Sequence, residues 1–415
     1  MKKSNVVLCL FFIFLVLPMS VYGQLKVWSF TEELANIRNY FRRAHPEINI
    51  EYSQTPADQF QARLDIALNT GKNAPDIIAL EISFVRKYVE SGLLLDLTDI
   101  YEANKDKLLA YPAEIGTYNG KVYAMSWQSY PGAMFYRRSL AKKYLGTDDP
   151  NVVQTYFSDF NKFLESAELL RVKSRGSCVV VSSRDDLRNP FLSARKDPWI
   201  VNGKPVIDPV MEEYMDICKT LHDNRMEGRV GQWSEGWFDG MEGELKDESG
   251  KPMEVFSYFL PTWGLHYVFK TIAPGTAGDW AMIQGPSPYH WGGTWIAAYK
   301  GTKNVAAAKE FIRYATTDDV FLEAWAKDTG NIVNSINVIN KIKDNYSEPY
   351  LGGQNHYAQF AETAKVINGK LLQATDDAIE ALWDEAVSAY VHEEKTKAQA
   401  IADFRKKAEA QFARR

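Results

Sequence analysis

The residues after the first two dozen alternate between strand-like and helix-like runs, and this alternation restricts the fold more than any other feature. Strand-like runs lie at 25–30, 48–52 and 75–80, and amphipathic helix-like runs lie between them at about 31–44 and 58–69. Apolar residues recur at helical spacing in both helix-like runs. This order predicts a parallel α/β sheet with right-handed crossovers, in which ligands meet the carboxyl ends of the strands.

Acidic residues follow two of these strands at the ends where ligands are expected. Glu32 and Glu33 come after the first strand, and Glu81 comes after the third. They are candidates for ligand contact, because the carboxyl ends of parallel strands meet at one edge of a sheet. Acids in these positions also suit the start of a helix, where the macrodipole favours negative charge. Both interpretations stay open at this point.

Aromatic residues cluster in loop-like stretches beside glycine, proline and single polar residues, and they indicate a sugar ligand. A pyranose ring has one apolar C–H face and a rim of hydroxyls, so flat aromatic side chains fit it. Adjacent glycines at 292 and 293 allow close approach of the backbone. Core packing is the alternative for each tryptophan, above all for the pair at 233 and 237, whose spacing suits one helix face. The candidate ligand contacts are Trp127, Tyr130, Trp233, Trp237, Trp263, Trp291, Gly293 and Trp295.

The first 23 residues have the features of a secretion signal. Lys2 and Lys3 precede an apolar run at 6–17, and small residues three and one positions before Gln24 suit a cleavage site. The run is shorter than the roughly 20 residues that span a bilayer. We expect residues 1–23 to be removed on export to the periplasm, with an uncleaved anchor as the alternative. No cysteine stands at the cleavage site, so the sequence gives no support for a lipid anchor.

Length, charge and cysteine content narrow the class of protein. About 390 residues would remain after cleavage, which is more than one core usually supports, so we expect two domains. A net charge of −5 spread along the chain argues against nucleic acid and anionic membranes as partners. Cys178 and Cys218 form either one disulfide or two buried thiols. No Cys/His cluster has metal-ligand spacing, so we expect neither a metal nor a cofactor.

Two further patterns concern the organisation of the chain. Strand-like runs at 122–127 and 133–136 flank Pro131 and Gly132, which suits a crossing between two lobes. Residues 376–412 are rich in Ala, Glu and Lys and carry an apolar stripe, which predicts a C-terminal helix.

Several short motifs occur in a fixed order over most of the chain. They are GKNAPDII at 71–78, YVESGLLLDL at 88–97, NGKVYAM at 119–125, MFYRRSL at 134–140, GGTWIA at 292–297, KNVAAAKEFI at 303–312 and AKDTGN at 326–331. In this order they resemble family 1 extracellular solute-binding proteins of ABC transporters, the sugar-type group that includes maltose-binding protein. Two aromatic segments depart from that pattern, at 233–243 and 258–264.

The resemblance implies a two-lobe periplasmic binding protein fold (type II-like) with a hinge between discontinuous lobes. The N-terminal lobe would comprise 24–129 plus 292–329, and the C-terminal lobe 130–291 plus 330–415. A carbohydrate would bind between the lobes as they close, and the closed monomer would dock on the membrane permease subunits of an ABC transporter. Asn331, where the chain returns between the lobes, is a further candidate contact.

A secreted glycoside hydrolase is the main alternative. Such an enzyme needs two carboxylates about 5–10 Å apart, and Glu235 with Asp239 is the one pair in an aromatic stretch. The sequence has no G-x-S-x-G, H-E-x-x-H or P-loop motif. A binding protein for an amino acid, a polyamine or a metal is the second alternative, and it would favour a tight charge cluster in the cleft. The sequence therefore predicts a binding protein with no catalytic residues.

Overall fold

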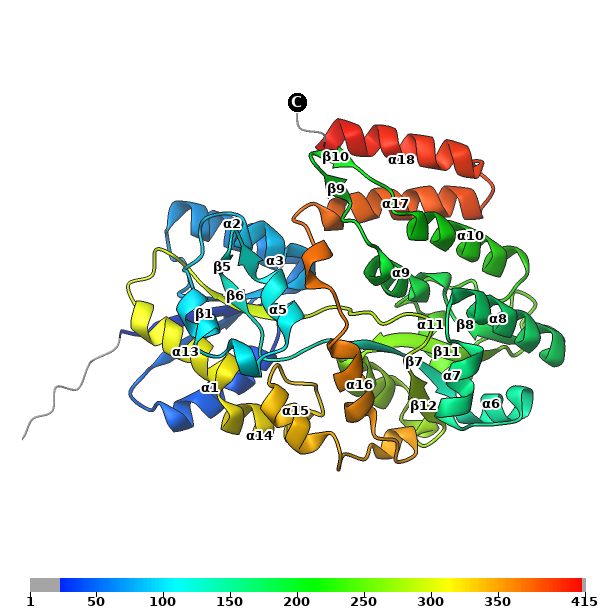
Figure 1. Cartoon of the computed structure of the whole chain (residues 1–415), viewed down its shortest axis with the longest axis horizontal. Coiled ribbons are helices and arrows are strands. Elements are labelled where there is room, and N and C mark those ends of the chain that lie inside the picture. Colours follow the sequence, from blue (N-terminus) through cyan, green and yellow to red (C-terminus); the bar gives the residue numbers. More distant parts are fainter. Residues whose placement is uncertain (1–22, 413–415) are drawn as a thin grey trace, which may run out of the picture.

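The computed structural model describes residues 23–412, which form two α/β lobes joined by several chain crossings (Figure 1). The predicted export signal at 1–23 lies outside the described residues, except for Gly23. Within 23–412, no helix is both long enough and apolar enough to cross a membrane. The α/β fold class predicted from the sequence is confirmed, and the two lobes differ in how their sheets are built.

The first lobe is built on a five-stranded sheet with the strand order β2-β1-β3-β13-β6. The three strands of the N-terminal alternation are parallel, and two strands from later in the chain extend the sheet beyond β3. Of these two, β13 runs antiparallel to both β3 and β6. The observed strand ends differ from the predicted ones by one or two residues. The strands are β1 (Leu25–Ser29), β2 (Ile50–Gln54), β3 (Ile77–Glu81), β6 (Ala124–Met125) and β13 (Thr294–Ala298).

Helices pack against this sheet, and local sequence explains where they form. They are α1 (Glu33–Ala44), α2 (Ala57–Thr70), α3 (Ile82–Val89), α4 (Thr98–Glu102), α5 (Ala110–Ile115), α13 (Val305–Thr317) and α14 (Asp319–Thr329). In α1, Leu34, Ile37 and Phe41 share one face and are buried in the core. α2 ends at Gly71, whose left-handed φ of 67° suits a residue without a side chain.

The second lobe is built on a four-stranded sheet with the order β12-β7-β11-β8. β7 runs antiparallel to both of its neighbours, and β11 runs parallel to β8. The strands are β7 (Gly132–Arg137), β8 (Cys178–Val181), β11 (Glu254–Pro261) and β12 (Trp280–Ile283). The helices are α6 (Arg138–Leu145), α7 (Pro150–Tyr156), α8 (Phe160–Ser174), α9 (Arg188–Ala194), α10 (Pro209–Asp223), α11 (Glu235–Glu242), a π-helix (Gly264–Phe269) and α12 (Lys270–Ile272). Four short strands complete the described sheets: β4 (Thr117–Tyr118), β5 (Lys121–Val122), β9 (Ile200–Val201) and β10 (Lys204–Pro205).

Three stretches of chain cross between the lobes and lie side by side, at 127–132, 289–293 and 331–334. The first stretch leads from β6 in one sheet to β7 in the other, as the pattern around Pro131 predicts. Backbone hydrogen bonds join it to both of the others, so the crossings form one narrow connection. These bonds are Ser129 N to Ile332 O (2.7 Å), Gly132 N to Tyr289 O (2.7 Å) and Trp291 N to Tyr130 O (3.2 Å).

The chain after residue 330 returns to both lobes. α15 (Ile336–Ile342) packs against α14, whereas α16 (His356–Ala364) packs against β7. The predicted C-terminal helix is two helices, α17 (Asp376–Val391) and α18 (Lys397–Phe412), which lie against each other above the rest of the molecule in Figure 1. α17 also contacts α3 of the first lobe and α10 of the second. The lobe boundaries at 129/130, 291/292 and 329/330 stay a prediction.

The two cysteines that follow the predicted signal are buried free thiols. Cys178 lies in β8 and Cys218 in α10. Burial raises the pKa of both thiols well above the usual range, so the thiol form prevails at neutral pH. The sequence left open either one disulfide or two buried thiols. The structure favours two buried thiols, which pack as small apolar side chains in the core of the second lobe.

Candidate ligand-binding cleft

Two adjoining cavities lie between the lobes. The first has a volume of about 360 Å³ and the second about 230 Å³, and Glu81 and Gly292 line both. The first cavity is walled by the loop after β1, the end of β3, the crossings and the segment after β11. Its lining residues are Phe30, Thr31, Glu32, Glu33, Asn36, Glu81, Gln128, Tyr130, Trp263, Tyr267, Gly292, Gly293 and Thr294.

Glu33 is fixed in the wall of the first cavity by Gln128. It is the first residue of α1, and Gln128 Nε2 donates to Glu33 Oε1 (3.1 Å). Gln128 is oriented in turn, because its Oε1 accepts from Trp325 Nε1 (3.1 Å). Burial raises the pKa of the Glu33 carboxyl to about 7, and the Gln128 hydrogen bond offsets part of that effect. A carboxyl group is thus held at the ligand-facing end of the first strand, where the sequence predicts it.

Glu81 both caps a helix and lines the two cavities. Its Oε2 accepts from Ser83 N (2.8 Å) and Ser83 Oγ (2.6 Å), which caps the N-terminus of α3. Burial raises the pKa of this carboxyl, and the hydrogen bonds from Ser83 lower it. Glu32 lies at the N-cap position of α1 and also lines the first cavity, with its side chain largely exposed. The helix-start and cavity-wall interpretations therefore both apply to these acids.

Gly293 shapes the first cavity because no side chain fits there. Its φ of 133° lies in a region that only glycine readily adopts, and its carbonyl accepts from Ile82 N (3.1 Å). An added Cβ would come within 2.8 Å of ring atoms of both Tyr130 and Trp295. Tyr130 is itself fixed, since its hydroxyl accepts from Thr294 N (2.8 Å).

We therefore expect Gly293→Ala to lower the free energy of unfolding by about 2–3 kcal/mol, because strain and crowding add together. Urea unfolding of the mature chain measures this directly. Gly120→Ala is the matched control, since Gly120 also has a positive φ of 75° but no atom within 4 Å of the added Cβ. Equal losses for the two variants would show that the crowding at Gly293 contributes nothing.

Tryptophans 233, 263 and 291 form a cluster at the boundary between the two cavities. Trp263 lines the first cavity and Trp291 the second, and Trp263 Nε1 donates to Trp291 O (3.1 Å). Trp233 is 45% exposed and stacks on Trp263, with ring centroids 6.0 Å apart and an interplanar angle of 17°. Trp233 has a left-handed φ of 69°, which is rare for a bulky residue. Its packing against both neighbours offsets the cost of that backbone conformation.

The second cavity is lined by charged residues of α9 and α17 as well as by Trp291. Arg188 pairs with Glu380 and Asp384 at 3.0 Å each, and Arg195 lies 3.7 Å from Asp376. Burial and the nearby Glu380 together raise the pKa of the Asp376 carboxyl to about 7, and Arg195 offsets part of that effect. The cavity is lined by Glu81, Ile82, Ser83, Arg188, Asn189, Leu192, Ser193, Arg195, His290, Trp291, Gly292, Asn368, Leu371, Leu372, Asp376, Asp377 and Glu380.

Comparison with known proteins identifies the family of this chain. The family model for bacterial extracellular solute-binding proteins matches residues 36–346. The chain belongs to this family. The arabinooligosaccharide-binding protein of Bacillus subtilis is 22% identical over 384 residues, which cover 88% of this chain and 81% of that protein.

Solved structures agree with this family in fold. The crystal structure of an extracellular solute-binding protein of family 1 superimposes with a TM-score of 0.81 at 17% identity, covering 93% of this chain and 99% of that one. The sugar-binding protein MalE from Xanthomonas citri superimposes with a TM-score of 0.75 at 13% identity, covering 94% of this chain and 97% of that one. The predicted two-lobe binding-protein fold is thereby confirmed.

Several predicted contacts of this solute-binding protein lie outside the cleft wall. Trp127, Trp237 and Trp295 are fully buried and line neither cavity. Trp237 Nε1 donates to Asp186 Oδ1 (2.9 Å) and Trp295 Nε1 to Pro112 O (2.8 Å), so both indoles are satisfied inside a lobe. The structure corrects the expected role of these three rings from ligand contact to core packing.

Of the remaining predicted contacts, two lie outside the cavity lining and the others line the cleft. Asn331 is buried in the third crossing and lines neither cavity, and Trp233 reaches the cleft only through its stacking on Trp263. The structure brings the others together in the cleft: Glu32, Glu33, Glu81, Tyr130, Trp263, Trp291 and Gly293.

Other residues of the cleft wall were not predicted from the sequence. Tyr267 is 54% exposed and lines the first cavity from the π-helix, next to a segment that the aromatic pattern had identified. Arg195 directly follows α9 and Asp376 begins α17, about 180 residues later in the chain, so no local pattern links them. Gln128 stands beside the predicted Trp127 in the chain. The polar Gln128, rather than the ring of Trp127, lines the first cavity.

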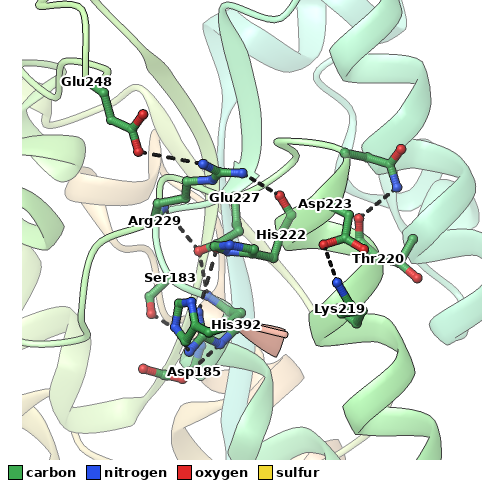
Figure 2. A network of polar contacts seen from close by, with 12 residues as sticks. Ser183, Asp185, Lys219, Thr220, His222, Asp223, Glu227, Arg229, Glu248 and His392 are labelled. Carbon is green, nitrogen blue, oxygen red and sulfur yellow. Dashed lines mark hydrogen bonds and ion pairs between the residues drawn. The ribbon is translucent and has the colours of Figure 1, made fainter. Parts of the chain in front are cut away.

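Two polar clusters lie away from the cleft. Glu227, which is 2% exposed, accepts from the amides of Arg184 (3.3 Å) and Arg229 (3.1 Å) and lies 3.1 Å from His222 Nδ1 (Figure 2). This network holds the segment after α10 next to β8, where Glu227 pairs with Val181. The residues of the network line neither cavity. The suggested hydrolase pair, Glu235 and Asp239, lies on α11 and also lines neither cavity.

The second cluster lies beside a hollow of about 600 Å³ next to the third crossing. His266, Glu348 and His356 bring their nitrogen and oxygen atoms within 4.8 Å of one another, although sequence spacing gave no sign of it. Lys270 Nζ donates to Glu348 Oε2 (2.9 Å), so an ammonium group already pairs with the carboxylate. The cluster therefore serves as an internal ion pair that joins the π-helix region to the segment before α16.

Proposed function

We propose that this protein is the extracytoplasmic carbohydrate-binding subunit of an ABC importer. One observation carries the proposal: a cavity between two lobes combines aromatic side chains with carboxyl and amide groups. Aromatic faces suit the C–H face of a sugar ring, and carboxylates accept hydrogen bonds from its hydroxyls. The curated relative named above is an arabinooligosaccharide-binding protein, and MalE is a sugar-binding protein, which supports the same ligand class.

The groups of the first cavity can supply the binding free energy that such a site needs. Micromolar affinity needs about −8 kcal/mol. Trp263 and Tyr130 offer ring contacts, and Glu33, Glu81 and Asn36 offer hydrogen-bonding groups in the first cavity. Glu33 is held in place by Gln128 before any ligand arrives, so little ordering of side chains opposes binding. A site of this kind also rejects analogues that lack the matching hydroxyls.

We propose further that the lobes close on the ligand about the three crossings. Tighter binding to the closed form shifts the population toward it, and the closed monomer would dock on the permease subunits. Export of the chain by the signal at 1–23, residence in the periplasm and the lobe boundaries given above belong to this proposal. So does the lack of catalysis: the cleft serves capture and release of an unaltered sugar.

A ligand screen tests the proposal. Residues 24–415 are mixed with arabino-, malto- and galacto-oligosaccharides, with amino acids as the comparison set, and thermal unfolding and tryptophan fluorescence are recorded. We expect at least one saccharide at about 100 times its Kd to raise Tm by roughly 3 °C, because binding adds about 2.7 kcal/mol to the free energy of unfolding.

Chromatography of the same mixtures separates binding from hydrolysis. Intact saccharide after prolonged incubation supports a binding protein, whereas accumulating shorter sugars would identify a hydrolase. A Tm raised by an amino acid and by none of the saccharides would contradict the carbohydrate assignment.

A further inference from the structure

The first cavity has an excess of acidic groups that no basic side chain balances. Three carboxyl groups line it, those of Glu32, Glu33 and Glu81. Among the described residues that line this cavity there is no lysine, arginine or histidine. The nearest arginines of the cleft, Arg188 and Arg195, line the second cavity and pair there with acids of α17. Burial raises the pKa of the Glu33 carboxyl to about 7 in the absence of a cation beside it, and a cationic group on the ligand would favour its ionised form.

The three carboxyl groups of this cavity also call for hydrogen-bond donors. Ionised carboxylates only accept. Two donors beside them are already engaged, since Gln128 Nε2 donates to Glu33 and Trp263 Nε1 donates to Trp291 O. Asn36 and Tyr267 line the same cavity and can donate as well as accept. A ligand group that lies among the three carboxyl groups must therefore bring donors. An ammonium group brings three donors and no acceptor.

Aromatic rings complete the environment that a cation prefers. Phe30, Tyr130, Trp263 and Tyr267 line the same cavity as the three carboxyl groups. The face of an aromatic ring attracts a cation, and this attraction grows when the cation loses its water. A neutral sugar would use these rings only through its C–H groups.

The adjoining cavity extends the surplus of acceptors. Asp376 is 3% exposed and lines that cavity. Within residues 23–412, neither of its carboxylate oxygens has a hydrogen-bond partner, and Arg195 Nη2 lies 3.7 Å away, beyond hydrogen-bond distance. A buried carboxyl group without a hydrogen-bond donor is costly, and a donor on the ligand would remove that cost.

We propose that the carbohydrate bound by this protein carries protonated amino groups, as an oligomer of 2-amino-2-deoxyhexose units does. One amino group lies among Glu33, Glu81 and the rings of the first cavity, and the next unit reaches Asp376 in the second. This inference rests on the proposed function, because it specifies the sugar within the same cleft.

Calorimetry with three disaccharides tests the inference at pH 6.5. They share one β-1,4 skeleton and differ at C2: the deacetylated glucosamine dimer, its N-acetylated form and the glucose dimer. We expect the amino form to bind at least tenfold more tightly than either neutral form. Equal or tighter binding of a neutral form overturns the inference and leaves the proposed function standing. Absence of binding by all three, when an amino acid or polyamine binds, overturns both.

A charge-neutral variant separates the cation from general contact. Glu33→Gln keeps the size of the side chain. We divide the dissociation constant of each neutral disaccharide by that of the amino form, and we expect this ratio to fall toward one in the variant. Glu213→Gln removes one negative charge from an exposed position of α10 outside the cleft and should leave the ratio unchanged. Thermal unfolding confirms that both variants are folded. An unchanged ratio in folded Glu33→Gln contradicts the inference.

Discussion

Replacing Trp263 by alanine weakens saccharide binding by about 30-fold, which corresponds to about 2 kcal/mol. Trp263 is the indole that lines the first cavity, and its ring is fixed by the hydrogen bond to Trp291 O and by stacking against Trp233. A preorganised ring gives contact area to the ligand at little entropic cost. Calorimetric titration of residues 24–415 with the best saccharide of the screen measures the loss.

Two further variants identify the source of this effect. Trp263→Phe keeps an aromatic face and should lose at most about fivefold in affinity. Trp233→Ala removes a ring that lines neither cavity, and its effect should stay below that of Trp263→Ala because it acts only through the stacked neighbour. A loss for Trp233→Ala equal to that for Trp263→Ala would show that the cluster as a whole, rather than the cavity ring, binds the sugar.

Glu33→Gln raises the free energy of unfolding of the ligand-free protein at pH 8 by as much as about 2 kcal/mol and leaves it unchanged at pH 4. Burial raises the pKa of Glu33 from 4.5 to about 7. Between these values the folded protein binds more protons than the unfolded chain, so stability falls as pH rises through this window. Above pH 7 the buried negative charge remains as a cost, and glutamine removes it.

Urea unfolding at pH 4, 6 and 8 measures this difference. The tyrosines whose titration the Glu33 charge influences, Tyr130 and Tyr267, have raised pKa values and stay neutral over this range. Glu213→Gln serves again as the control and should track the parent protein at every pH. A stabilisation by Glu33→Gln that is the same at pH 4 and pH 8 would contradict a buried carboxyl with a raised pKa.

The N-terminal half of the first lobe follows from local sequence. Apolar strands and amphipathic helices alternate at 25–80, and each element is short enough that its own pattern defines it. Glu33 and Glu81 follow from the same logic, because the topology places the carboxyl ends of β1 and β3 on one edge. Local pattern did not predict the break between α17 and α18. That stretch has neither glycine nor proline, yet Glu393 turns with a φ of 61° so that the two helices pack together.

The tryptophans show why the site was only partly predictable. Trp127, Trp263 and Trp295 all stand beside small or polar residues, so their local sequences look alike. Which ring reaches the cleft depends on the strand or helix that carries it. Trp295 lies in β13 and points into the core, while Trp263 follows the end of β11 and reaches the cavity. The pairing of α9 with α17 in the second cavity likewise exists only after folding.

A crystal structure of residues 24–415 with a bound saccharide tests most directly whether the ligand lies between the lobes. We predict a sugar ring against Trp263, with hydrogen bonds to the carboxyl groups of Glu33 and Glu81 and with the lobes closed about the three crossings. A saccharide bound instead in the hollow beside His266 and Glu348, or on the outer face of one lobe, would contradict the proposed cleft.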